Sequence, residues 1–127
     1  MKSPILFIFP LMIFIFSCTP PKKEVIVSDI VQFDLKEAEN GILIDVRTPA
    51  EFREGHLPGA VNIDVRSSDF TEKIRKIDKK EQVYLYCKSG NRSTKATSIM
   101  DSLGYFHIHN LDGGINAWSD AGKPVEK

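Results

Sequence analysis

Short apolar runs alternate with segments of helical periodicity along most of the chain. The apolar runs predict about five strands, because β-branched and aromatic residues fit a pleated, buried surface. The expected strands lie within Val25–Val31 and at Ile42–Arg47, Val61–Ile63, Val83–Tyr86 and Phe106–His109. The segments between them predict helices after Asp34, Thr48 and Ser68, and at Ser93–Leu103 and Ile115–Ala121.

Two of the helices begin with the spacing of a capping box, in which two side chains each bond a backbone N–H of the first turn. The first box pairs Asp34 with Glu37, and the second pairs Thr48 with Glu51. Pro49 occupies the first helical position of the second helix, where its missing N–H costs nothing. Arg47 is close enough in the sequence to pair with Glu51 across this turn.

The helix between the third and fourth strands lacks such a box. Ser67 or Ser68 is expected to cap it, and the helical pattern continues to about Ile77. Phe70, Ile74 and Ile77 recur at helical spacing, so we expect them to form its buried stripe.

This alternation of strands and helices predicts an α/β fold for residues 25–127. The central sheet is expected to be mostly parallel, with about five strands and helices on both faces. In such sheets the functional site lies off the carboxyl ends of the strands. Cys87 directly follows the strand Val83–Tyr86 and therefore lies at such an end, while Trp118 is expected to be buried by the last helix.

Length and charge narrow the class of protein. The 127 residues fit one domain preceded by an N-terminal segment. Lys and Arg together number 17, as do Asp and Glu, so the net charge is close to zero. This balance does not indicate a nucleic-acid-binding protein.

Residues 1–17 have the organisation of a lipoprotein signal peptide. Lys2 precedes an unbroken apolar stretch, Ile5–Phe16, which is shorter than the roughly 20 residues that span a bilayer. The following Ile-Phe-Ser-Cys sequence resembles the bacterial lipobox. That resemblance implies cleavage before Cys18 and acylation of Cys18.

The same resemblance implies that residues 18–24 are a lipidated cysteine followed by a short polar tether. The alternative is an uncleaved N-terminal anchor helix, which Pro4 and Pro10 disfavour. The prediction is an exported protein, anchored in the membrane by lipid on Cys18 and facing the periplasm or cell envelope. Cys87 is then the one cysteine left with a free thiol.

A polar, glycine-containing loop joins Cys87 to the next helix. Its residues are Lys88, Ser89, Gly90, Asn91, Arg92 and Ser93. A turn of this kind directs backbone N–H groups and a helix N-terminus at the thiol. Because a free cysteine, with a pKa of about 8.5, is mostly protonated at neutral pH, we predict that these groups stabilise the Cys87 thiolate without a general base.

Several charged residues near the strand ends allow two interpretations. Lys88 and Arg92 would attract an anionic substrate, or Arg92 would brace the loop. We expect a structural polar network, rather than a catalytic role, for Asp45, Arg47 and Glu51, because charges beside a buried strand need partners.

The histidines do not indicate a catalytic or metal site. His56 has no partner motif and is expected to be structural or exposed. His107 and His109 alternate along the last strand, but no third metal ligand is recognisable near them. We therefore predict neither a metal nor another cofactor.

Four blocks of the chain resemble the rhodanese domain. They are Ile44–Phe52, Gly55–Ile63, Cys87–Ser93 and Leu111–Trp118, in the order and spacing of that family. The resemblance covers about Val25 to Val125 and implies a single rhodanese-like fold with Cys87 as the catalytic residue. It also implies that Cys87 takes sulfur from thiosulfate or a similar sulfane donor, as a persulfide. A thiophilic acceptor such as cyanide or a protein thiol would then remove this sulfur.

Two other functions stay open. A rhodanese-like domain can also bind, carry or sense sulfane sulfur for a partner protein without turnover. Phosphatases and arsenate reductases of the same fold form the other alternative, but related phosphatases have five residues between the cysteine and the arginine. Here four residues separate Cys87 from Arg92, and this shorter loop favours sulfur over phosphate.

Overall fold

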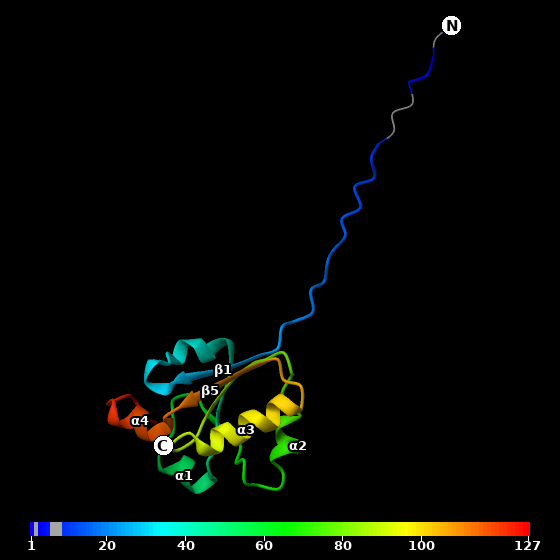
Figure 1. The fold of residues 1–127 in the computed structure, drawn as a ribbon. Helices are drawn as coiled ribbons and strands as arrows, with labels where there is room; N and C mark the ends of the chain where they lie inside the picture. The colour runs from blue at the N-terminus through cyan, green and yellow to red at the C-terminus, as the bar shows by residue number, and fades with distance from the viewer. Residues whose placement is uncertain (2, 6–8) are drawn as a thin grey trace.

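The computed structural model describes residues 1, 3–5 and 9–127. Residues 2 and 6–8, which belong to the predicted signal peptide, lie outside the described residues. The described residues before Glu24 form neither helix nor strand, and they extend away from the domain (Figure 1). Within the described part of the chain, no helix is long and apolar enough to cross a membrane.

Five strands form one sheet, and every pair of neighbouring strands is parallel. The strands are β1 (Glu24–Asp29), β2 (Gly41–Asp45), β3 (Val61–Asn62), β4 (Gln82–Tyr86) and β5 (His107–Asp112). Their order across the sheet is β1-β5-β4-β2-β3. The predicted α/β fold with a mostly parallel central sheet is confirmed.

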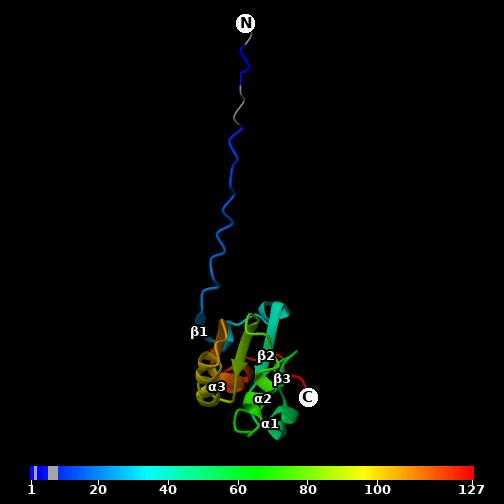
Figure 2. The ribbon, with the colours of Figure 1, turned by 90° about the vertical axis from the view of Figure 1, so that its right-hand side faces the viewer.

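Helices lie on both faces of this sheet, as predicted (Figures 1 and 2). They are the 3-10 helices η1 (Ile30–Gln32) and η2 (Leu35–Asn40) and the α-helices α1 (Pro49–Glu54), α2 (Phe70–Ile74), α3 (Asn91–Ser102) and α4 (Gly114–Asp120). Since the sheet is buried on both sides, its central strands are apolar along their length rather than alternating.

The core consists of two clusters, one on each face. On one face Phe70 and Ile74 of α2 pack with Met100 of α3 against β4, and Ile77 is partly buried beside them. On the other face Trp118 of α4 packs with residues of η1 and with Tyr84 and Tyr86 of β4. The predicted burial of Phe70, Ile74 and Trp118 is confirmed, but α2 ends at Ile74 instead of continuing to about Ile77, so Ile77 lies beyond the helix.

Both predicted capping boxes are present, at Asp34 and at Thr48. The prediction that Ser67 or Ser68 caps α2 is wrong, because Asp69 occupies the N-cap position. Ser67 instead donates its hydroxyl hydrogen bond to the Asp69 carboxylate at 2.6 Å, which holds the turn before the helix. The first predicted helix is a 3-10 helix rather than an α-helix.

The last strand is longer than predicted and begins one residue later. It runs to Asp112 because parallel pairing with β1 continues as far as Asp29. The helix after Cys87, in contrast, begins two residues earlier than predicted, at Asn91, because Gly90 takes a left-handed conformation and serves as its N-cap. The helix therefore begins only four residues after the cysteine.

Candidate active site

Cys87 lies at the carboxyl end of β4, in the middle of the sheet. Cys87 is only 1% exposed, so its sulfur is enclosed by the loop that follows. The Gly90 N–H donates to Sγ at 3.0 Å. The predicted arrangement, a thiol beneath backbone N–H groups at the start of a helix, is present.

The surroundings of the sulfur favour its anionic form. Burial by itself would raise the pKa of the Cys87 thiol. Hydrogen bonding from the backbone and hydroxyl of Ser93, and from the N–H groups of Gly90 and Ser89, outweighs burial and leaves that pKa below its ordinary value. A larger fraction of the thiol is therefore ionised at neutral pH than in a free cysteine.

The carbonyl side of the loop is held by the start of α4. The N–H of Ile115 donates to the Cys87 carbonyl at 2.9 Å, and that of Asn116 donates to the Lys88 carbonyl at 3.1 Å. Gly114 lies so close to these carbonyls that a Cβ atom there would overlap both of them. Two helices thus fix the loop, α3 from the sulfur side and α4 from the carbonyl side.

Arg92 braces the loop rather than extending freely from it. Its Nη1 and Nη2 donate to the two carboxylate oxygens of Glu51, at 2.7 and 2.9 Å. The hydrogen bonds from Arg92 hold the pKa of Glu51 well below its usual range. Of the two interpretations of Arg92, the structure supports the one in which it braces the loop. The loop residues Lys88, Ser89 and Asn91 are exposed.

Asp45, Arg47 and Tyr86 form a second, buried polar group under the loop. Arg47 Nη2 lies 2.6 Å from Asp45 Oδ2, to which the Tyr86 hydroxyl also donates at 2.9 Å. Burial and the Asp45 carboxylate raise the pKa of Tyr86, so its hydroxyl remains a donor. The expected pairing of Arg47 with Glu51 is wrong, because the buried Asp45 needs the Arg47 charge.

The histidines and Cys18 lie apart from this loop. His56 stacks on Phe52 and joins the C-terminal tail through backbone bonds to Glu126. His109 stacks on Tyr84 and bonds Gln82. Cys18 is exposed in the N-terminal segment, and both cysteines are free thiols.

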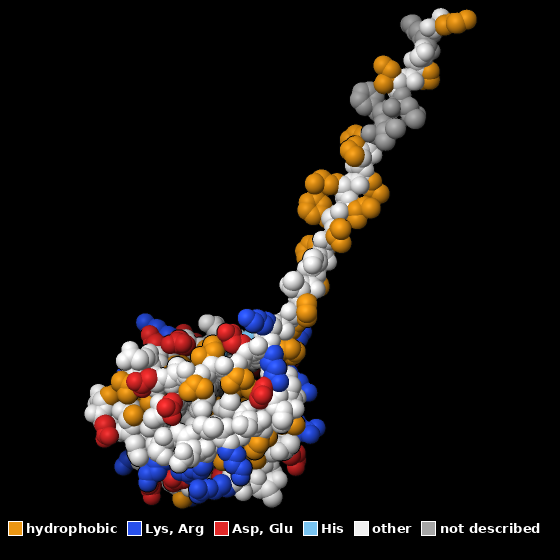
Figure 3. Space-filling view, viewed as in Figure 1, with side chains coloured by type: hydrophobic (Ala, Val, Ile, Leu, Met, Phe, Trp, Pro, Cys, Tyr) orange, Lys and Arg blue, Asp and Glu red, His pale blue; other side chains and the backbone are white. Residues whose placement is uncertain are grey.

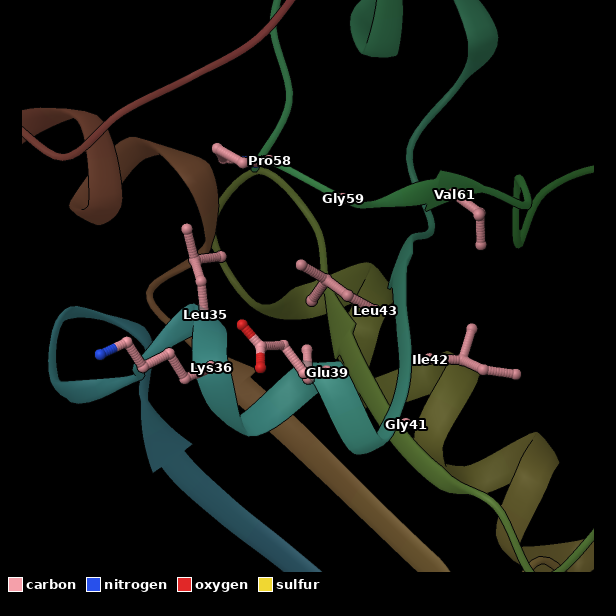
Figure 4. Close-up of a pocket in the computed structure, with 10 residues that line it drawn as sticks. Leu35, Lys36, Glu39, Gly41, Ile42, Leu43, Pro58, Gly59 and Val61 are labelled. Atoms are coloured by element: carbon pink, nitrogen blue, oxygen red, sulfur yellow. The ribbon is translucent and has the colours of Figure 1, made fainter.

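Two hollows flank this part of the fold. One, of about 280 Å³, lies directly beside the loop and is lined by Lys88, Glu51, Arg47 and Asn116 among others. A larger one, of about 460 Å³, lies between η2, β2 and the segment before β3, where Figure 4 shows Leu35 and Leu43. The larger hollow contains no residue of the Cys87 loop, whereas the smaller one includes Lys88 of that loop.

The comparison with known families settles what this geometry belongs to. The model of the rhodanese-like domain matches residues 33–121, which is well over half of the chain. The chain belongs to the rhodanese-like domain family. All of the elements that hold the Cys87 loop, from η2 to α4, lie within the matched residues.

Relatives of this rhodanese-like domain include proteins described as sulfurtransferases. A sulfurtransferase of Allochromatium vinosum is 36% identical over 72% of this chain and 83% of its own. Thiosulfate sulfurtransferase 16 of Arabidopsis thaliana is 34% identical over 79% of this chain and 91% of its own. The crystal structure of a rhodanese-related protein from Thermoplasma volcanium, 27% identical, superimposes with a TM-score of 0.64 over 83% of this chain and 97% of its own.

Sequence reasoning missed several residues that support the rhodanese-like loop. Asp112 packs its carboxylate against Gly90, and Gly114 packs against the Lys88 carbonyl. Both belong to the Leu111–Trp118 block, which the sequence analysis used for the family resemblance without giving Asp112 or Gly114 a role. The polar hydroxyl of Tyr86, at the end of an otherwise apolar strand, was the signal for a buried partner such as Asp45.

Proposed function

We propose that the protein is a sulfurtransferase that carries sulfane sulfur as a persulfide on Cys87. The observation that carries this proposal is the set of hydrogen-bond donors around the sulfur, which lower the pKa of the Cys87 thiol. Such donors stabilise a thiolate, and they stabilise a terminal persulfide anion for the same reason. Membership of a family with sulfurtransferase relatives supports it.

The reaction proceeds in two displacements. In the first, the Cys87 thiolate attacks the outer sulfur of thiosulfate or a similar donor, the S–S bond of thiosulfate breaks, and sulfite leaves with the bonding electron pair. In the second, an acceptor such as cyanide or a protein thiolate attacks the outer sulfur of the persulfide. Cys87 is then released as the thiolate, so neither displacement requires a general base.

The position of Arg92 favours sulfur chemistry over phosphoryl transfer. Phosphoryl transfer needs positive charge directed at the oxygens of the transferred group. Both terminal nitrogens of Arg92 are instead taken by Glu51. The four-residue spacing between Cys87 and Arg92 also leaves a tighter loop than the five-residue spacing of related phosphatases.

The proposal extends to the location of the protein. We propose that the chain is cleaved before Cys18, lipidated there and exported, so that the domain acts at a membrane surface. Two or more acyl chains give stable anchoring, where one is marginal. Mass spectrometry of the membrane-extracted protein tests this proposal, because a mature chain that retains residues before Cys18 and carries no lipid would overturn it.

Sulfur transfer is tested by incubating the domain with thiosulfate and then with cyanide, and measuring thiocyanate. The wild-type domain is expected to turn over, and a Cys87→Ser variant is expected to fall to the uncatalysed rate. Turnover by the wild type no faster than by the variant would contradict the enzymatic proposal. Mass spectrometry of the same samples, before cyanide is added, shows whether Cys87 has gained one sulfur atom without turning over, as a sulfur carrier would.

A further inference from the structure

The carbonyl oxygen of Gly90 has more donors than it needs. It accepts from the Thr94 N–H at 3.1 Å, from Thr94 Oγ1 at 2.9 Å and from Ser93 Oγ at 3.0 Å. A carbonyl oxygen has two lone pairs. The two bonds from Thr94 are therefore enough to satisfy it, and the bond from Ser93 can be given up.

The Ser93 hydroxyl has a second neighbour, the sulfur of Cys87. Sγ lies 3.6 Å from Ser93 Oγ, and in the thiol form the S–H is the donor of this contact. When the thiol loses its proton to water, the sulfur becomes an acceptor without a hydrogen to offer. The Ser93 hydroxyl has one hydrogen, so it can donate to the sulfur anion only if its hydrogen bond to the Gly90 carbonyl is broken.

Asn110 of β5 fixes the direction in which Thr94 donates. Its Nδ2 donates to Thr94 Oγ1 at 3.1 Å, so the Thr94 hydroxyl hydrogen is directed at Gly90. Within the described residues, Asn110 Oδ1 is buried without a hydrogen-bond partner. An unpaired buried oxygen is unfavourable, so the bond from the Asn110 amide nitrogen to Thr94 is kept although it leaves Asn110 Oδ1 without a partner.

We propose that Thr94, held by Asn110, is a positioning residue that satisfies the Gly90 carbonyl and so frees the Ser93 hydroxyl to turn to the Cys87 sulfur anion. This inference deepens the proposed function, since a persulfide anion needs the same donor. It concerns the hydrogen bonding of the sulfur itself and applies whether the sulfur is turned over or only carried.

The charged groups around the sulfur do not account for this change in the hydrogen bonding of the Ser93 hydroxyl. Arg92 lies near Cys87 but is ion-paired with Glu51 of α1. Lys88 is exposed, and Asp112 at the end of β5 packs against Gly90. Thr94 is hydrogen-bonded to Gly90, Ser98 and Asn110 and to none of these charged side chains, so a change in the ionisation of the thiol is expected to report on the hydroxyl network.

The test is the pH titration of the Cys87 thiolate by its ultraviolet absorbance in the Thr94→Val variant, without any sulfur donor. The Thr94 side chain is exposed, so the substitution leaves the core intact. Losing one hydroxyl bond should hold Ser93 on Gly90 and raise the thiolate titration midpoint. At a fixed pH below that midpoint, the thiolate fraction should fall by about three- to tenfold.

Thr97→Val is the matched control. Thr97 makes the same kind of hydroxyl bond to a carbonyl one turn back, at 2.8 Å to Ser93, but does not touch Gly90. Its titration should equal that of the wild type, as should that of Thr94→Ser, which keeps the hydroxyl. In a Ser93→Ala background, Thr94→Val should have no further effect, because Thr94 acts through Ser93.

Two results would overturn the proposal. One is a thiolate titration of Thr94→Val that matches that of Thr97→Val. The other is an equal effect of Thr94→Val with and without the Ser93 hydroxyl. If Thr94→Val does not fold, Asn110→Leu removes the donor to Thr94 Oγ1 and must raise the midpoint in the same direction. Failure of the thiocyanate assay leaves these titrations unaffected, so the two proposals fail separately.

Discussion

At the scale of single residues, Gly90 carries the conformation that brings an N–H to the sulfur. Its φ angle of 116° lies in the left-handed region, and a Cβ atom there would meet the Asp112 carboxylate. Both backbone strain and steric overlap therefore oppose any other residue. Gly122 also has a positive φ, of 73°, but nothing lies within 4 Å of the position of its Cβ.

We expect Gly90→Ala to lower the free energy of unfolding by more than the roughly 1–2 kcal/mol that a left-handed alanine costs, because Asp112 must also move. Sulfur transfer should be lost, since the Gly90 N–H would no longer point at Sγ. Gly122→Ala should cost only the backbone strain and keep its activity. Chemical denaturation and the thiocyanate assay measure both, and equal losses in the two variants would contradict the role given to Gly90.

At the scale of elements, the pair Glu51–Arg92 joins the start of α1 to the start of α3. The two residues are 41 positions apart, and their side chains are 27% and 14% exposed. Glu51 also closes the capping box of α1 by accepting from the Thr48 N–H at 3.0 Å. One carboxylate therefore fixes both the helix that follows β2 and the helix that follows the Cys87 loop.

Glu51→Gln should keep the capping box and lose the ion pair. We expect the free energy of unfolding to fall by about 1–2 kcal/mol, since the pair is partly solvent-screened. Lys73→Gln, which removes an ion pair with Asp69 that is about half exposed, should cost less. Urea denaturation compares the two variants, and an equal or larger loss in Lys73→Gln would refute the bracing role of Glu51.

The same pair predicts a pH dependence of stability. Arg92 lowers the pKa of Glu51 in the folded state, so the stabilisation is complete above the ordinary glutamate pKa of about 4.3 and is lost as the pH falls below it. The difference in unfolding free energy between the wild type and Glu51→Gln should therefore shrink as the pH falls from about 5 toward 2. A difference that stays constant over this range would exclude the ionised carboxylate as its source.

The elements also show which features the sequence could predict and which it could not. Capping boxes, the buried stripe of α2 and the strand that delivers Cys87 depend on neighbouring residues, so they were predictable. The partners of Arg92 and Arg47 were not, because they depend on which strands become neighbours in the sheet. Arg47 has two carboxylates close in sequence, Asp45 and Glu51, and only the burial of Asp45 decides between them.

At the scale of the whole molecule, the N-terminal segment and the Cys87 loop lie at opposite ends of the sheet. Glu24, the first residue of β1, and Gln82, the first residue of β4, are both paired with His107 of β5, so these two strands begin at the same end of the sheet. Cys87 follows the last residue of β4 and therefore lies at the other end. The N-terminal segment leaves the domain on the side away from α1 in both views (Figures 1 and 2). Five residues of β4, at about 3.3 Å each, give a separation of roughly 16 Å along the sheet.

The tether that would join a lipid on Cys18 to this end of the domain is short. Lys23 is already fixed to α3, where its Nζ lies 2.7 Å from the Asp101 carboxylate. The chain from Cys18 to Lys23 reaches at most about 18 Å when fully extended. In Figure 3, Lys and Arg side chains gather along the lower edge of the domain, at the end away from the N-terminal segment, and charges of both signs are mixed over the rest of the surface shown.

A lipid-anchored protein should therefore keep its Cys87 loop directed away from the bilayer. On vesicles, the lipidated protein should transfer sulfur to a water-soluble thiol at the rate of the unlipidated domain, within about twofold. An acceptor thiol attached to a lipid headgroup should react more slowly with the anchored protein than the same thiol in solution, because the loop faces the wrong way. Lengthening the tether with a flexible segment after Lys22 should remove this difference, because the domain could then rotate and bring the Cys87 loop to the membrane surface. If the short-tethered protein reacts equally fast with both acceptors, the opposite placement of anchor and thiol has no consequence for function.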